Sequence, residues 1–401
     1  MKRRALLSAA VATTAVAGLP AKAQTLVGVT AKEIKIGNTI AYSGNASAYG
    51  VIGKSHAAYF KMVNAMGGVN GRMINFISYD DAYSPPKTVE QVRRLVEQDQ
   101  VACLFNTLGT PTNSAIHKYV NQQKIPHLFV STGADKWADP KNYPWTIGFQ
   151  PSYRTEAQIY AAYIKKVKPD AKIAVIYQND DFGKDYVTGL KDGFGADYDK
   201  WVVKALTYEP TDATIDSQAL TMHGAGANTV VTIGIPKFAA QMIRKIHDLN
   251  WKPLHIMTNV SISISSVMQP AGPEKSIGMI SSTYLKDLTD PQWKADKGMI
   301  QWKEWMAKWN PDGDVLDASN AFAYNAAITM HQVLKQCGDD FSRENIMRQA
   351  ANIKNLELPL SLPGILVNTS PTNFHPYAQL QLQRWTGSTW ELFGEIISAA
   401  T

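Results

Sequence analysis

The chain has 401 residues, of which 45% are hydrophobic, and a formal net charge of +6. This length allows two or three domains with sizeable cores. Four uncompensated positive charges lie in the first 23 residues, and without them the net charge is about +2, which is too small to indicate nucleic acid or an anionic membrane as a partner.

Residues 1–23 have the pattern of an export signal peptide. A basic start (residues 2–4) precedes a small-apolar stretch (residues 5–19) and an A-x-A cleavage site (residues 21–23). The apolar stretch is too short for a membrane span. We therefore expect cleavage after Ala23 and a periplasmic mature protein. The common export route is the favoured one, and the two arginines at the start leave twin-arginine export open.

Strands and helices alternate from Glu33 onward. Alternating or short apolar runs predict strands, and apolar residues at helical spacing predict the helices between them. The predicted strands of this part are residues 34–40, 73–79, 101–105 and 126–130. The predicted helices are residues 57–66, a segment from Ser84 and a segment from Pro111.

The alternation restarts after residue 147. Predicted strands are residues 173–177, 202–208, 230–233 and 254–257, with helices at 159–167, 182–194, 215–223 and 236–249. Three further helices (298–309, 318–336 and 343–351) and two strands (378–385 and 389–393) follow. Repeated strand–helix units indicate an α/β fold of two doubly wound parallel-sheet lobes.

No motif of a nucleophilic enzyme, a zinc protease, a P-loop or a redox pair occurs, and the eight His are scattered. We therefore expect no catalytic centre, no metal and no cofactor. Asp80-Asp81 and Asp180-Asp181 follow strands, where capping of the next helix is the simpler role than cation binding. Cys103 and Cys337 could pair in an oxidising compartment, but we favour two free thiols.

Small, hydroxyl-rich turns follow several strands. The first is residues 37–54, with Tyr42, Ser43 and Tyr49; the others are residues 106–110, 131–134 and 178–183. Backbone N–H and hydroxyl groups at the carboxyl ends of parallel strands can hold a carboxylate without a catalytic base. Each turn alone is equally compatible with an ordinary strand–helix connection.

Several of these motifs together resemble exported solute-binding proteins of the branched-chain amino acid (leucine/isoleucine/valine) type, which serve ATP-driven importers. The matching motifs are the signal peptide, Tyr42-Ser43-Gly44 with Tyr49-Gly50, residues 67–72 (GGVNGR), Tyr79-Asp80-Asp81 and residues 181–184 (DFGK). The resemblance covers the mature chain and implies the type I periplasmic binding protein fold, with a three-crossover hinge. It implies a first lobe of residues 25–146 and 283–363 and a second lobe of residues 147–282 and 364–401.

The resemblance also implies the ligand site. The carboxylate-holding turns fall at Leu108, Gly109 and Thr110 and at Ser131, Thr132, Gly133 and Ala134, and the aromatic lid falls at Phe182. Where the family has an acid for the ligand ammonium, this chain has Thr258, Asn259, Val260 and Ser261. Burying an ammonium without a counter-charge is costly, and Tyr42, Tyr49 and Phe182 suit an apolar body. An amine-free carboxylate, such as an aromatic acid, is therefore favoured over leucine. A branched-chain amino acid is the alternative ligand, if an acid from a loop, such as Asp287 or Glu274, reaches the site.

We thus expect a monomeric, exported binding component of an ABC importer, with a membrane permease as partner and no reaction of its own. The alternative is a ligand sensor of the same fold that signals to a membrane receptor. An enzyme ranks third, because no base lies beside a nucleophile in any motif.

Overall fold

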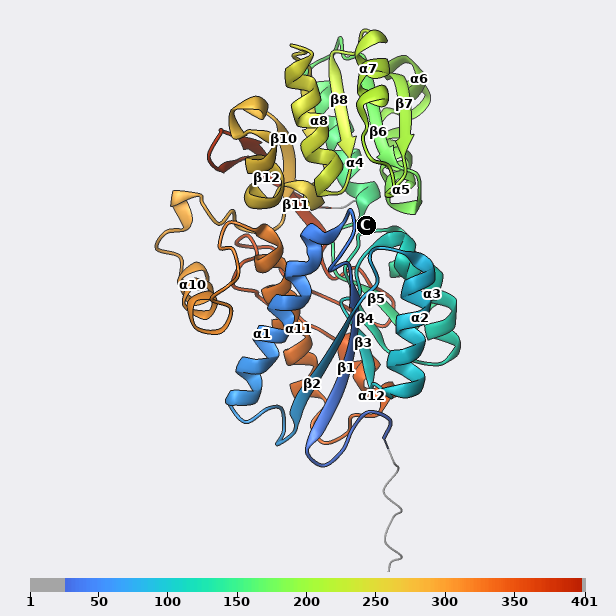
Figure 1. Cartoon of the computed structure of the whole chain (residues 1–401), viewed down its shortest axis with the longest axis vertical. Helices are drawn as coiled ribbons and strands as arrows, with labels where there is room; N and C mark the ends of the chain where they lie inside the picture. Colours follow the sequence, from blue (N-terminus) through green and yellow to red (C-terminus); the bar gives the residue numbers. More distant parts are fainter. Residues whose placement is uncertain (1–25, 399–401) are drawn as a thin grey trace, which may run out of the picture.

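The computed structural model describes residues 26–398, so the predicted export signal lies outside the described residues. One lobe, the lower in Figure 1, is built on a five-stranded parallel sheet with the order β2-β1-β3-β4-β5. In its first strand Ile34 and Ile36 are buried, whereas Glu33 and Lys35, which alternate with them, are partly exposed. The strands are β1 (Glu33–Ile40), β2 (Met73–Asp80), β3 (Cys103–Phe105), β4 (His127–Val130) and β5 (Thr146–Gly148).

The other lobe is built on a seven-stranded sheet with the order β12-β11-β10-β9-β8-β6-β7. Its strands β6 to β10 are parallel, and the last two strands of the chain add an antiparallel hairpin at one edge. The strands are β6 (Ile173–Gln178), β7 (Val202–Tyr208), β8 (Thr229–Ile233), β9 (Leu254–Met257), β10 (Ile280–Thr283), β11 (Gln379–Trp385) and β12 (Trp390–Ser398).

Helices cover both sheets, and the late helices return to the first lobe, where α11 packs against α1. The helices are α1 (Gly50–Ala65), α2 (Pro85–Arg93), α3 (Thr110–Gln122), α4 (Tyr153–Val167), α5 (Asp181–Phe194), α6 (Tyr198–Trp201), α7 (Asp216–Gly224), α8 (Pro236–Asp248), α9 (Gln269–Ala271), α10 (Lys297–Trp309), α11 (Ala318–Gln336) and α12 (Arg343–Ala350).

The prediction of two parallel-sheet lobes is confirmed. The chain crosses between the lobes three times: after β5, after β10 and before β11. Both sheets reverse their strand order at one point, between β1 and β3 and between β6 and β8. In open α/β sheets such a switch point is where ligands bind.

Candidate functional site

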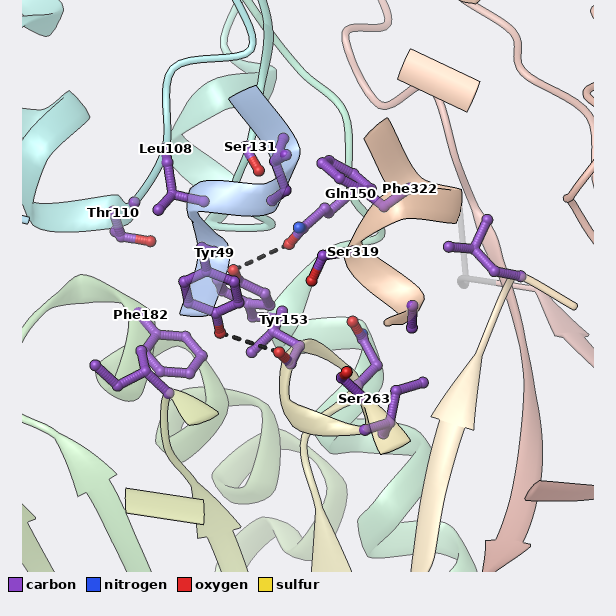
Figure 2. A pocket seen from close by; sticks show the side chains of 18 of the residues that line it. Tyr49, Leu108, Thr110, Ser131, Gln150, Tyr153, Phe182, Ser263, Ser319 and Phe322 are labelled. Atoms are coloured by element: carbon purple, nitrogen blue, oxygen red, sulfur yellow. Dashed lines mark hydrogen bonds between the residues drawn. The ribbon is translucent and has the colours of Figure 1, made fainter. Parts of the chain in front are cut away.

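A cavity lies between the two lobes, where loops that follow strands of both sheets meet (Figure 2). About 770 Å³ between its protein atoms is unfilled, including space open to solvent. Its lining is mostly aromatic and aliphatic. Among residues 26–398, no Asp, Glu, Lys, Arg or His side chain lines it. A charge on a ligand in this cavity therefore meets dipoles and not a counter-ion.

The turn between β3 and α3 lines the cavity with Leu108, Gly109 and Thr110. The N–H groups of Leu108 and Gly109 donate to the backbone oxygens of Thr39 and Ser131, so the backbone donor that this turn leaves for a ligand is the N–H of Thr110. Gly109 has a φ of 97°, a conformation that favours glycine, and a Cβ there would lie 2.4 Å from the ring of Tyr83. The first N–H groups of a helix have no intrahelical partner and carry the positive end of its dipole. The start of α3 is therefore suited to an anion.

Ser131 places a hydroxyl beside this turn. It forms a parallel β-bridge with Leu108, and its carbonyl oxygen accepts a hydrogen bond from the N–H of Gly109 (3.3 Å). The side chain is 4% exposed and lines the cavity (Figure 2), and its Oγ has no hydrogen-bond partner among the described residues. Because buried polar groups are nearly always bonded, a ligand oxygen is the natural partner of this hydroxyl.

Gln150, which follows β5, is a polar lining residue that the sequence interpretation missed. Its Oε1 accepts a hydrogen bond from the hydroxyl of Tyr153 (3.1 Å; Figure 2). The amide nitrogen of Gln150 is therefore left as a further donor on the same side of the cavity as Ser131. No motif marks this position, since β5 is three residues long and the chain is changing lobes there.

Phe182 closes the cavity from the second lobe, at the start of α5. Asp180 caps this helix by accepting a hydrogen bond from the N–H of Phe182 (2.9 Å), as the sequence predicts. The Phe182 ring packs edge to face against Tyr153 and Tyr186, with centroid separations of 5.0 and 5.7 Å. The ring is thus held over the cavity by its neighbours as well as by its helix cap.

Asn259 and Val260 lie in the turn after β9, and both line the cavity together with Tyr49 from the first lobe. The Tyr49 hydroxyl donates a hydrogen bond to the backbone oxygen of Val260 (3.0 Å; Figure 2). Tyr49, Leu108, Gly109, Thr110, Ser131, Phe182, Asn259 and Val260 are thus predicted site residues that the structure brings together. Their part in binding a ligand stays a prediction.

Glu156, on α4, lies directly behind Asn259 with an exposed fraction of 0%. Its Oε1 accepts a hydrogen bond from the Asn259 backbone N–H (2.9 Å), and its Oε2 accepts from Asn259 Nδ2 and from the Tyr186 hydroxyl (2.7 Å). Burial raises the pKa of Glu156, and the hydrogen bonds it accepts oppose that rise. An acid therefore lies next to the turn after β9, although it comes from a different element and does not line the cavity.

The sequence interpretation missed Glu156. The available signal was its position three and four residues before Ile159 and Tyr160, on the inward face of the predicted helix. A carboxylate on an apolar helix face needs hydrogen-bond partners inside the protein, and this requirement could have marked the residue.

Tyr42 and Ser43 do not line the cavity. The Tyr42 hydroxyl is 2.7 Å from Ser78 Oγ, and exposed Ser43 donates to Asp80 Oδ2 (2.5 Å). Asp80 also accepts hydrogen bonds from the backbone N–H groups of Tyr42, Ser43 and Ala82. The aspartate thus ties the loop after β1 to the end of β2, and it does not cap the helix that follows, contrary to the sequence interpretation.

Thr132, Gly133 and Ala134 also lie outside the cavity lining and support it from behind. Thr132 Oγ1 is 2.5 Å from Thr110 Oγ1 and accepts a hydrogen bond from the Ala134 N–H (3.3 Å). The carbonyl oxygen of Gly133 accepts from the Tyr153 N–H (2.9 Å). These groups are already hydrogen-bonded inside the protein, and of the four residues predicted here only Ser131 lines the cavity.

Further hydrogen bonds join the lobes around the cavity. Asn45 Nδ2 donates to the Pro210 carbonyl oxygen (2.7 Å), and Lys136 Nζ forms an ion pair with Asp181 Oδ2 (2.7 Å). On the hinge side, Ser263 Oγ donates to Asp317 Oδ1 (3.0 Å). The lobes are therefore in contact on several sides of the cavity, which is a closed arrangement.

Residues 33–389 match the family model described as periplasmic binding protein. The chain belongs to this family. A curated relative, Leu/Ile/Val-binding protein homolog 7 of Brucella suis, is 23% identical over 269 residues, which are 64% of this chain and 65% of the relative. The chain thus spans less than two thirds of that relative's length, and the resemblance to the leucine/isoleucine/valine-binding type is confirmed.

Two solved structures show how far the fold is shared by this periplasmic binding protein. A branched-chain amino acid ABC transporter protein of Thermus thermophilus with bound valine has a TM-score of 0.81 at 17% identity, covering 93% of this chain and 98% of its own. A solute-binding protein of R. palustris in complex with 4-hydroxybenzoate has a TM-score of 0.75 at 16% identity, covering 92% and 98%. Within residues 26–398, no helix is long and apolar enough to cross a membrane.

Proposed function

We propose that this chain is the exported solute-binding component of an ABC importer and binds a small carboxylate between its lobes without transforming it. The observation that carries the proposal is the buried, unpartnered Oγ of Ser131 in the cavity lining, beside the start of α3. Together with the Gln150 amide and the N–H of Thr110 at the start of α3, it forms a set of donors with no acid among them. Such a set fits a carboxylate.

The second-lobe side of the cavity supports an amine-free acid over an α-amino acid. Asn259 and Val260 provide only neutral groups there, and the carboxylate of Glu156 is fully buried behind them. An uncompensated buried ammonium costs several kcal/mol, and each 1.4 kcal/mol is about tenfold in affinity. Aromatic rings and aliphatic side chains dominate the remaining lining, so the ligand body is apolar.

The relatives support the transport role. The two structural neighbours described above are named as ABC transporter proteins, one with valine and one with 4-hydroxybenzoate bound. We therefore propose a periplasmic location after cleavage of residues 1–23, a membrane permease as partner and a monomeric binding protein. We assign residues 25–146 and 283–363 to one lobe and residues 147–282 and 364–401 to the other.

Calorimetry with matched ligands tests the proposal. Benzoate with benzamide and 4-methylpentanoate with 4-methylpentanamide differ only in the carboxylate, and 4-methylpentanoate with leucine differs only in the α-amine. We expect at least one acid to bind more than tenfold tighter than its amide, because only the carboxylate matches the donor set, and 4-methylpentanoate to bind tighter than leucine. Submicromolar leucine with no binding of either acid would contradict the ligand class, and chemical conversion of a bound acid would contradict a purely binding role.

A further inference from the structure

Asn259 is held by the same buried carboxylate through both its backbone and its side chain. Its N–H donates to Glu156 Oε1 (2.9 Å), and its side-chain Nδ2 donates to Glu156 Oε2. An ionised carboxylate can only accept hydrogen bonds. The amide nitrogen of Asn259 must therefore face Glu156, and its Oδ1 is turned to the opposite side.

The cavity is on that opposite side. Asn259 lines the cavity, and Glu156 is 0% exposed behind it. The Val260 carbonyl oxygen, the neighbouring backbone acceptor, already accepts a hydrogen bond from Tyr49 (3.0 Å). Asn259 Oδ1 is thus a neutral acceptor in the cavity lining, separate from the donors of Ser131 and Gln150, which line the same cavity.

Two tyrosines keep Glu156 in place. Tyr186 donates to Oε2 (2.7 Å) and also bonds Thr258 Oγ1. Tyr160 bonds Oε1 and lies 2.9 Å from the carbonyl oxygen of Met257. Both tyrosines are therefore anchored to the residues that lead into the turn of Asn259. The carboxylate is held by four donors in a rigid part of the second lobe, so it can orient Asn259 without touching the ligand.

We propose that Glu156 is a positioning residue that fixes Asn259 Oδ1 toward the cavity, and that the ligand carries an uncharged hydrogen-bond donor, such as a hydroxyl, on its side away from the carboxylate. This inference rests on the proposed carboxylate-binding function. An ammonium would find one neutral acceptor here where it needs up to three, whereas a hydroxyl is satisfied by one. Amine-free hydroxy acids are thus the ligand class that matches both sides of the cavity.

The test uses calorimetry on the mature protein with acids that differ by one hydroxyl: benzoate against 3- and 4-hydroxybenzoate, and phenylacetate against 4-hydroxyphenylacetate. We expect at least one hydroxy acid to bind about 5- to 10-fold tighter than its parent, as for one neutral hydrogen bond. In Glu156→Gln the new amide can also donate, so Asn259 is free to turn its nitrogen to the cavity. The hydroxyl preference should then disappear while the parent acid keeps its affinity.

Glu97→Gln is the matched control, because Glu97 also accepts a hydrogen bond from a tyrosine, Tyr119 (3.0 Å), but on the surface of the first lobe. It should leave the preference unchanged. If Glu156→Gln does not fold, Asn259→Leu removes the acceptor directly and should give the same loss of preference. In a double variant, Glu156→Gln with Asn259→Asp, the charge moves to the cavity lining, and 4-(aminomethyl)benzoate, whose ammonium lies away from its carboxylate, should gain affinity relative to 4-methylbenzoate.

The outcomes separate the two proposals. Acids that bind wild type without any hydroxyl preference, or a preference that survives in both Glu156→Gln and Asn259→Leu, would overturn this inference and leave the carboxylate site intact. Phenylalanine binding wild type tighter than every hydroxy acid would also overturn it. Loss of the carboxylate requirement in the acid and amide pairs would overturn the proposed function, and this inference with it.

Discussion

The hydroxyl of Tyr49 in the first lobe lies 3.0 Å from the backbone oxygen of Val260 in the second lobe and donates a hydrogen bond to it. Both residues also line the cavity. The same side chain therefore forms part of the binding surface and joins the lobes. We therefore expect closure of the lobes and formation of the site to occur together at this position, as in ligand-linked hinge motion.

Tyr49→Phe should weaken ligand binding about 2- to 10-fold, because it removes one inter-lobe hydrogen bond and leaves the Val260 oxygen unpaired. Calorimetry with the tightest amine-free acid measures the change, and solution scattering should show less compaction on adding ligand. Tyr59→Phe is the control, since the Tyr59 hydroxyl bonds His331 within the first lobe (3.2 Å). Equal losses in both variants would contradict the role of Tyr49 in closure.

Gly109→Leu should abolish binding in a protein that still folds. A Cβ at this position would lie 2.4 Å from the Tyr83 ring, and the backbone has a φ of 97°. Gly67→Leu is a matched control, because its φ of 100° imposes the same backbone strain but nothing lies within 4 Å of a Cβ there. Thermal unfolding and calorimetry on both variants separate backbone strain from blockage of the site. Unchanged binding by folded Gly109→Leu would remove this turn from the site.

Ser131→Ala should weaken acid binding about 10- to 100-fold, as for a hydrogen bond to a charged group. The unliganded protein should keep or gain stability, because the buried Oγ has no partner to lose among the described residues. Ser281→Ala should behave in the opposite way. The Ser281 hydroxyl donates to the Met257 carbonyl oxygen (2.8 Å) and does not line the cavity, so this variant loses stability and keeps its affinity.

Asp81→Asn should change the pH dependence of stability. Burial raises the pKa of Asp81 to about 6, compared with about 3.9 in an unfolded chain. Between these values the folded protein binds more protons, so the stability contributed by this group is lost as pH rises through 6. The free energy of unfolding of Asp81→Asn, taken relative to that of wild type, should therefore rise by about 1–3 kcal/mol between pH 4 and pH 7. Urea unfolding measures this, with exposed Asp199→Asn as control; a pH-independent difference would contradict it.

The two thiols should be unreactive in the native protein. Cys103 and Cys337 are free and buried, and burial raises the pKa of each to about 12. Thiolate is the reactive form. A thiol reagent should therefore detect no cysteine in buffer and both cysteines in guanidinium. If the reagent detects no cysteine in guanidinium without reductant, the two cysteines form a disulfide when the protein is produced in an oxidising compartment.

The fold could be predicted from the sequence because its signals are local. Alternating Ile34 and Ile36 mark β1, and Asp180 before Phe182 marks the start of α5. Turns at the ends of parallel strands converge because of topology, so the turns that contain Gly109, Ser131 and Phe182 can be predicted from their own neighbours in the chain. The choice of these three positions within the turns follows from the resemblance to the family.

The remaining parts of the site depend on contacts between distant segments. Glu156 reaches Asn259 across 103 positions in the sequence, and no pattern near either residue reports the other. Within the turn of residues 131–134, only side-chain direction separates Ser131 from Thr132, whose hydroxyl bonds Thr110. Tyr42 and Ser43 were predicted in the site because the loop's residue types are suitable, but Asp80 holds the loop elsewhere.

Among residues 26–398, no charged side chain lines the cavity. This limits the number of negative charges that a ligand can carry. Helix N–H groups and hydroxyls can replace the water around one carboxylate, but a second negative charge would lie against rings and aliphatic groups with no cation nearby. Succinate, phthalate and phosphate esters should therefore be rejected even when they fit by size. From a mixture of metabolites, the protein would therefore bind acids with one negative charge and reject those with two, even where both have a suitable shape.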